Sequence, residues 1–291
     1  MIVSTDTAVL KLSHGDAESV RMLKEVGFDA YDYSMFVSPL GFEDPLDLPD
    51  YRQYAANLRA YADQVGIVCN QAHAPFPSST GNSEDDQKIF EKIVRSMETA
   101  AILGAKIIIV HPCQHLEYAT HAEELKEINL AFYQKLIPYC EQFGIKVATE
   151  NMFQWDVKED HALHSTCSQA EEFKEYVDML DSPWIVGCLD IGHVGLVGED
   201  VVHMIHTLGK DRLRALHVHD NDGQYDQHTL PYTRNIDFSA VLKALKEIGY
   251  SGDFTFESNS FGGPFPKELY AQCFRFMREV GQHMASQICG E

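Results

Sequence analysis

The chain has 291 residues, 45% of them hydrophobic and 23% charged, a balance that excludes bulk disorder and allows a large buried core. Its 44 acidic and 23 basic residues give a formal net charge of −21, which disfavours a nucleic-acid partner, because nucleic-acid-binding proteins normally present a basic face to phosphate. The first residues show no basic segment followed by an apolar run, so we expect no signal peptide, and no stretch approaches the roughly 18 consecutive apolar residues of a membrane helix. These features predict a cytoplasmic protein without a membrane partner.

Short apolar runs alternate with longer amphipathic runs along the whole chain. Ile107–Val110 is a nearly continuous apolar run, which is typical of a strand buried on both faces. The expected strands are Ile2–Thr5, Ala30–Tyr33, Ile67–His73, Lys106–His111, Lys146–Glu150, Val186–His193, Leu213–His219 and Asp253–Glu257. Their number and spacing indicate repeated strand–helix units.

The segments between these strands carry helix signals. Asp86–Leu103 places apolar residues on one face, and Ser168 with Glu171 predicts a capping box that opens the next helix. Glycines such as Gly66 and Gly104 stand where a helix would end before a strand. Eight such units predict an α/β protein, a single-domain (β/α)8 TIM barrel over residues 1–291. An open doubly wound sheet is disfavoured, because no GxGxxG follows the first strand.

Polar residues stand where six consecutive expected strands end. An acidic or histidine side chain buried there is costly unless something satisfies it, and one cation satisfies several such groups at once. Any one of them alone would more often be a hydrogen-bonded core residue or a helix cap. Six in succession predict a metal site, and they are His73, His111, Glu150, Asp190, His217 and Glu257.

At these residues the sequence resembles the xylose isomerase-like TIM-barrel superfamily, most closely its sugar phosphate isomerase/epimerase branch. The resemblance runs from the first strand to the eighth, and its most specific segment is Leu216–Gly223. It implies one divalent ion per chain, either manganese, zinc, cobalt or magnesium, bound by three carboxylates and one imidazole. The implied ligands are Glu150, Asp190, His217 and Glu257.

The resemblance also implies a reaction. The expected substrate is a sugar or sugar phosphate, which would lose a proton next to its carbonyl and form a metal-stabilised enediolate. Glu150 and Glu257 would be the catalytic residues, one removing the proton and the other returning it, in an epimerase or an aldose–ketose isomerase. The other expected substrate contacts are His193, His219, Arg234 and Trp155, with Phe36 and Phe76 packing on the sugar.

Other functions stay open at this stage. The related AP endonuclease family 2 binds three zinc ions, and counterparts of its nine ligands are His73, His111, Glu150, Asp190, His193, His217, Asp226, His228 and Glu257. A multinuclear zinc hydrolase is therefore one alternative, and a polyol-ketone dehydratase and a non-catalytic sugar-binding barrel are others. Arg234 lies in a turn, Tyr232–Asn235, that lacks the glycines common in relatives, and it could contact a substrate phosphate or be solvent-exposed. The sequence leaves open whether the chain forms a homo-oligomer.

Overall fold

Eight parallel strands follow one another around a barrel in chain order. The computed structural model describes residues 1–36 and 43–290. One parallel sheet contains β2 (Ala30–Ser34), β3 (Val68–His73), β4 (Ile107–Ile109), β5 (Lys146–Glu150), β8 (Ile185–Asp190) and β9 (Leu213–His217). β1 (Val3–Thr5) pairs in parallel with β10 (Phe254–Phe256). Parallel bridges between Asp6 and Asp32 and between Val218 and Phe256 join this pair to the two edges of the sheet. The predicted TIM barrel is confirmed.

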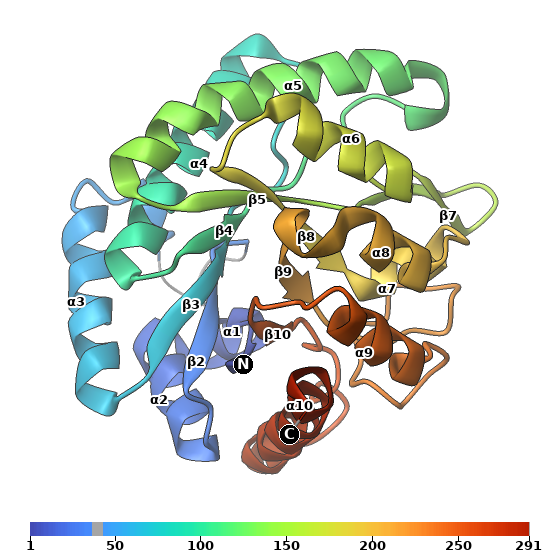
Figure 1. Cartoon of the computed structure of the whole chain (residues 1–291). Helices are drawn as coiled ribbons and strands as arrows, with labels where there is room; N and C mark the ends of the chain where they lie inside the picture. Colours follow the sequence, from blue (N-terminus) through green and yellow to red (C-terminus); the bar gives the residue numbers. More distant parts are fainter. Residues whose placement is uncertain (37–42, 291) are drawn as a thin grey trace.

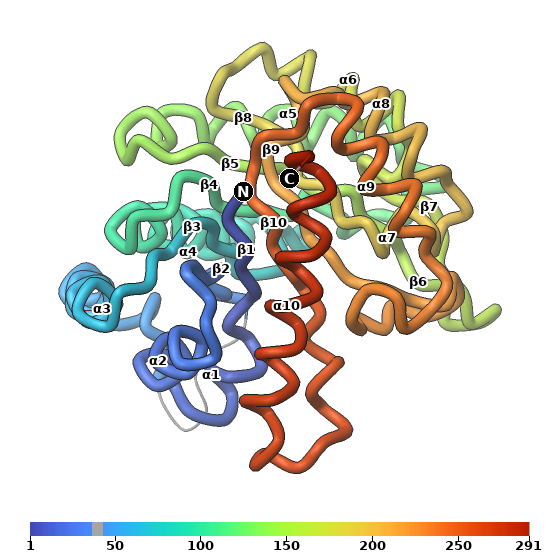
Figure 2. Tube along the Cα trace, turned by 60° about the horizontal axis from the view of Figure 1, so that its bottom comes forward, coloured from blue at the N-terminus to red at the C-terminus, as the bar shows by residue number. Residues whose placement is uncertain are grey.

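Helices surround the strands on the outside of the barrel (Figure 1). The last helix, α10 (Tyr270–Cys289), packs directly against β1 and β10, where Gly281 leaves no room for a side chain beside Val3 and Phe256. Both chain ends therefore lie near each other (Figure 2). The longer helices are α2 (Asp16–Val26), α3 (Tyr51–Val65), α4 (Ser83–Leu103), α5 (Tyr118–Phe143), α6 (Ala170–Leu180), α8 (Val201–Arg212), α9 (Phe238–Glu247) and α10 (Tyr270–Cys289). Within the described residues, every helix is too short or too polar to cross a membrane.

Several shorter elements complete the described chain. They are the helices α1 (Ala8–His14) and α7 (Ile191–Leu196), the 3-10 turns η1 (Pro45–Asp47) and η2 (Lys267–Leu269), and the strands β6 (Phe153–Asp156) and β7 (His161–His164). β6 and β7 form an antiparallel hairpin between β5 and α6 that the sequence did not predict. α1 and this hairpin both contribute to the rim of the barrel.

Two local predictions are wrong. The strand expected over Val186–His193 ends at Asp190, because the Asp190 carboxylate accepts a hydrogen bond from the backbone N–H of His193 and begins helix α7. The expected capping box is also absent, since Gln169 precedes the first residue of α6. The Ser168 hydroxyl instead accepts from the backbone N–H of Ser165.

Residues inside the barrel alternate with residues that face the helices. A small interior cluster contains Ile109, Ala148, Val186, Cys188 and Ala215. Glu150, Asp190 and His217 each follow a member of this cluster by two residues, so they point to the same interior at the C-terminal strand ends. Small apolar side chains thus fill the barrel below, and polar side chains project above them.

Candidate metal centre and active site

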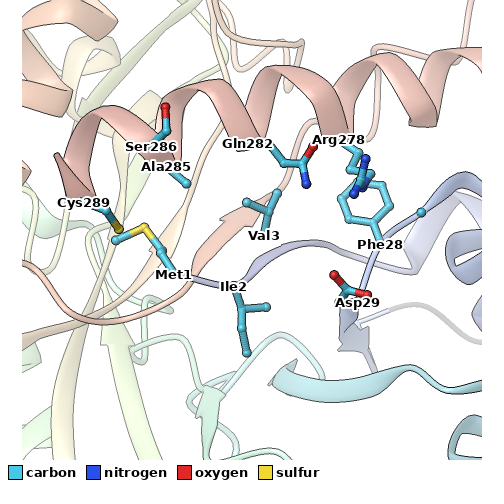
Figure 3. A pocket seen from close by; sticks show the side chains of 11 residues that line it. Met1, Ile2, Val3, Phe28, Asp29, Arg278, Gln282, Ala285, Ser286 and Cys289 are labelled. Atoms are coloured by element: carbon cyan, nitrogen blue, oxygen red, sulfur yellow. The ribbon is translucent and has the colours of Figure 1, made fainter. Parts of the chain in front are cut away.

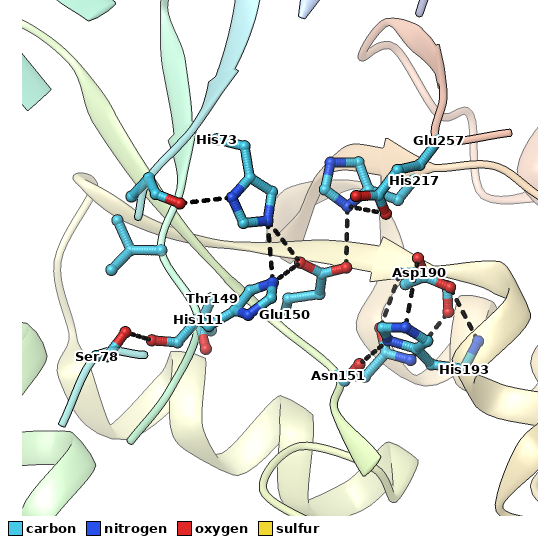
Figure 4. A network of polar contacts seen from close by, with 12 residues as sticks. His73, Ser78, His111, Thr149, Glu150, Asn151, Asp190, His193, His217 and Glu257 are labelled. Carbon is cyan, nitrogen blue, oxygen red and sulfur yellow. Dashed lines mark hydrogen bonds and ion pairs between the residues drawn. The ribbon is translucent and has the colours of Figure 1, made fainter. Parts of the chain in front are cut away.

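Four side chains from consecutive strand ends come together inside the barrel. Glu150, Asp190, His217 and Glu257 each place one potential ligand atom within 4.8 Å of the others. Nδ1 of His217 lies 2.9 Å from a carboxylate oxygen of Glu150 and 3.3 Å from one of Glu257 (Figure 4). These four are the residues that the sequence selects as metal ligands, and the fold brings all of them together.

A second group adjoins Glu150 on the side of β3 and β4. His73 and His111 approach each other with 3.0 Å between their Nε2 atoms, and Nε2 of His111 lies 3.1 Å from Oε2 of Glu150. The second ring nitrogen of His73 lies 2.8 Å from the carbonyl oxygen of Ala74, which fixes the ring orientation. His73, His111 and Glu150 therefore form a second group of converging ligand atoms.

A third group lies beside Asp190. Asp226 lies 2.8 Å from Nε2 of His228 and 3.6 Å from Nε2 of His193. His219 is fully buried behind these residues, with Nε2 2.9 Å from Asp190 and its ring stacked on His228 at 4.0 Å. The ligand atoms of His193, His219, Asp226 and His228 also converge within 4.8 Å.

The chemistry of this donor set fits a divalent cation. Oδ1 of Asp226 is a buried acceptor without a hydrogen-bond donor among the described residues, and the buried Oε2 of Glu150 faces the imidazoles of His111 and His73, at 3.1 and 3.9 Å. Buried acceptors of this kind are costly, and a positive ion removes the cost. Carboxylate and imidazole ligands together suit zinc, manganese or cobalt, and the carboxylates alone also suit magnesium.

Burial and mutual contact perturb the pKa values of these groups strongly. Burial raises the pKa of Glu257 to about 8 despite the nearby imidazoles of His217 and His228. Burial acts the same way on Glu150, but there His217 and His111 outweigh it and hold the pKa of the carboxyl well below its usual range. Burial, together with His111, lowers the pKa of His73 to about 3, so this ring is neutral at physiological pH. Such perturbation is typical of functional sites.

The three ligand groups face a cavity of about 570 Å³ at the C-terminal end of the barrel. This volume lies within the range of about 300–1,000 Å³ that is usual for small-molecule sites. Trp155, Phe36 and Phe76, which the sequence named as sugar contacts, line the cavity. His219 and Arg234 do not line it. The guanidinium of Arg234 instead donates to Gln227 and to the backbone carbonyl of Thr233.

Sequence reasoning missed several residues of this site. Asp32 on β2 is fully buried, with Oδ2 3.5 Å from Nε2 of His217 and 2.8 Å from the side-chain nitrogen of Gln71. The sequence signal that could have identified Asp32 is its position between Tyr31 and Tyr33 in a short buried strand. Further lining residues come from α1, the β6–β7 hairpin and the loops after β4, β5 and β10, and they include Leu12, Phe153, Gln114, Met152 and Asn259.

Another cavity, of about 320 Å³, lies at the opposite end of the barrel, where β1 begins and α10 passes (Figure 3). Met1, Ile2 and Val3 line one side, and Arg278 and Gln282 line the other. None of the converging ligand groups found among the described residues lies there. The chemistry-bearing side chains are therefore concentrated at the C-terminal end, as in characterised TIM-barrel enzymes.

The family model described as Xylose isomerase-like TIM barrel matches residues 20–280. The chain belongs to this family. Over the whole fold it is similar to a solved structure described as a D-tagatose 3-epimerase-like protein, with a TM-score of 0.76, 23% identity and coverage of 100% of this chain and 99% of the other. It is also similar to the IOLI protein with a bound zinc atom, with a TM-score of 0.74, 20% identity and coverage of 99% and 98%.

Two relatives are similar to the chain in sequence. The uncharacterized protein MJ1311 of Methanocaldococcus jannaschii is 28% identical over 252 residues, which cover 83% of this chain and 78% of that protein. A putative L-ribulose-5-phosphate 3-epimerase, SgbU, of Haemophilus influenzae is 25% identical over 202 residues, which cover 66% of this chain and 65% of that protein.

Proposed function

We propose that the chain is a divalent-metal-dependent sugar epimerase or isomerase, which acts by proton transfer next to a carbonyl. The observation that carries this proposal is the convergence of Glu150 and Glu257 on Nδ1 of His217, at 2.9 and 3.3 Å. Two carboxylates that share one centre can each reach a substrate held between them. The epimerases among the relatives and structural neighbours support this choice over a phosphoester hydrolase.

Glu150, Asp190, His217 and Glu257 would hold the ion, which would supply Lewis-acid polarisation of the substrate carbonyl. One of the two glutamates removes the proton from the carbon next to that carbonyl, and the other delivers a proton to the resulting enediolate. Delivery to the opposite face inverts the carbon, as an epimerase requires. His193 lines the same cavity and would orient a substrate hydroxyl.

The number of ions is part of the proposal. We infer one ion at the group of four ligands, because this group contains three carboxylates and therefore the greatest density of negative charge. The zinc atom in the IOLI neighbour supports a divalent ion at a barrel of this kind. The groups around His73 and Asp226 offer further ligands, so a count of three zinc ions per chain would favour the hydrolase alternative.

The test is incubation of the metal-loaded protein with ketoses and their phosphate esters in deuterated water. The proposal expects solvent deuterium at the carbon next to the carbonyl of at least one substrate. Removal of the metal should abolish exchange, and addition of the ion should restore it. Product formation without deuterium uptake, or exchange that survives metal removal, would contradict the proposal.

A further inference from the structure

The cavity contains three acidic side chains but no lysine or arginine among the described residues that line it. Its acidic members are Glu150, Asp226 and Glu257. The segment of residues 37–42, which lies outside the described residues, contains no lysine or arginine either. A phosphate group is normally held by arginine, lysine or a helix N-terminus. The lining therefore lacks the basic side chains that commonly hold a phosphate.

The basic residues nearest in the chain are engaged elsewhere. Lys11 lies between the lining residues Val9 and Leu12, but its ammonium group is 2.6 Å from the carbonyl oxygen of Ser34 and 3.3 Å from Asp16. This side chain is 1% exposed, so it cannot extend into the cavity without breaking both contacts. Arg234 contacts Gln227 and Thr233 outside the cavity.

The imidazoles of the cavity do not replace a basic side chain. His228 and His193 both face Asp226, at 2.8 and 3.6 Å, and each ring has a second carboxylate at 3.9 Å, from Glu257 and Asp190 respectively. His73, buried against His111, is packed under the ring of Phe36. An incoming phosphate would have to displace one of these internal partners.

Another part of the lining, next to His73 and His111, is apolar and open. Phe36 and Phe76 are stacked with 5.8 Å between ring centroids and 10° between planes, and they are 47% and 41% exposed. Phe36 lies over His73, and Phe76 lies edge-on to His111 at 5.1 Å. Leu12, 42% exposed, adds to this wall. Exposed apolar side chains grouped at a cavity indicate a ligand that covers them.

We propose that the cavity selects an unphosphorylated ketose. The end of the ketose that is farther from the four proposed metal ligands packs the face carrying its C–H groups against Leu12, Phe36 and Phe76. The inference rests on the function proposed above, because it assumes that the reacting carbonyl lies near Glu150 and Glu257. A phosphate ester at the distal end would bring a dianion against apolar rings with no cation to receive it, and that loss of hydration is costly.

Ligand binding and turnover together test this inference. Trp155 lines the cavity, and the chain contains only one other tryptophan, Trp184. In a Trp184→Phe variant, Trp155 fluorescence reports binding directly. D-fructose, D-psicose, D-tagatose and L-ribulose are each compared with their phosphate esters. We expect at least one free ketose to bind about tenfold or more tightly than its ester, the size expected when a charged group is left without a partner.

Two matched pairs of variants locate the cause. Leu12→Arg places a cation at the wall and should narrow the difference in affinity between ester and free ketose about tenfold, whereas Leu12→Gln should not. Phe36→Ala should weaken binding of the free ketose. Phe276→Ala removes an aromatic ring that is 53% exposed on α10, away from the cavity, and should not.

The outcomes separate this inference from the proposed function. Deuterium exchange with phosphate esters but not with free ketoses would overturn the inference and leave the proposed function standing. Absence of exchange with every ketose and every ester would remove the proposed function, and the inference with it. Equal affinity for esters and free ketoses would also overturn the inference, whatever the exchange shows.

Discussion

Asp32 and His217 face each other inside the barrel, with 3.5 Å between Oδ2 of Asp32 and Nε2 of His217. The other ring nitrogen of His217 faces Glu150 and Glu257. A carboxylate behind a histidine ligand orients the ring and fixes which nitrogen carries the proton. Asp32 is therefore placed to direct Nδ1 of His217 toward the proposed ion.

Replacement of Asp32 by Asn should weaken metal binding by about 10- to 100-fold, the usual cost of losing a partner of this kind. Titration calorimetry with zinc or manganese measures the change. Asp29→Asn, at an exposed carboxylate that pairs with Lys24 just before β2, is the control and should bind as the wild type does. Equal metal affinity in the Asp32→Asn and Asp29→Asn variants would contradict the role given to Asp32.

Metal binding should stabilise the fold, because the ligand atoms converge only in the folded chain. At an ion concentration of about 100 times Kd, the free energy of unfolding should rise by about 2.7 kcal/mol. Asp190→Asn should lose most of this increase while its amide oxygen still accepts from the N–H of His193. Thermal unfolding with and without the ion checks this. A full metal-induced shift in Asp190→Asn would exclude Asp190 as a ligand.

Glu150→Gln and Glu257→Gln should each lower the rate of epimerisation by about 100-fold or more, the range for loss of a proton-transferring group. Circular dichroism and metal content are measured alongside, because both residues are also proposed ligands. Glu124→Gln, at an exposed position on α5, is the control. Wild-type turnover in either variant would remove that glutamate from the mechanism.

Gly192 and Gly195 on α7 offer a paired test of site geometry. A Cβ on Gly192 would lie 1.9 Å from Cε1 of His219, whereas a Cβ on Gly195 would meet no atom within 4 Å. Because His219 is fully buried against Asp190, Gly192→Ala should cost about 1–3 kcal/mol of stability and displace Asp190. Gly195→Ala should cost much less. Denaturant unfolding compares the two variants, and equal costs would contradict this packing.

Glu172 on α6 gives a pH dependence separate from the metal centre. Burial raises the pKa of its carboxyl to about 7, although the Tyr118 hydroxyl and the N–H of Cys167 donate to it. The protonated form is thus favoured in the folded chain. In the unfolded chain this carboxyl loses its proton at about pH 4.5, so the free energy of unfolding should fall as the pH rises from about 4.5 to about 7. Glu172→Gln should remove this component of the pH profile of unfolding, and an unchanged profile would contradict it.

The barrel and the four proposed ligands could be predicted from the sequence for one physical reason. Each of the last four strands carries its polar residue at the C-terminal end, where consecutive parallel strands place their ends side by side. Glu150, Asp190, His217 and Glu257 therefore had to meet once the strands were assigned. Asp32 could not be found in this way, because its contact with His217 joins β2 to β9, the two edges of the six-stranded sheet, which are not neighbours in the strand order.

The rim of the barrel was less predictable. Leu12 reaches the cavity from α1, and Phe153 reaches it from the β6–β7 hairpin, and neither element follows the strand–helix rhythm of the sequence. His193 was assigned to a strand because the apolar run continued past Asp190. The hydrogen bond from the His193 N–H to Asp190 turns the chain into α7 at that point. Local capping outweighed the apolar pattern there.

The most direct test of the proposed centre is anomalous diffraction from crystals loaded with zinc or manganese. We expect the strongest anomalous peak among Glu150, Asp190, His217 and Glu257, at about 2.0–2.2 Å from their ligand atoms if the ion is zinc. Weaker peaks at the groups around His73 and Asp226 are compatible with this account. A strongest peak at either of those groups, with none among the four, would contradict it.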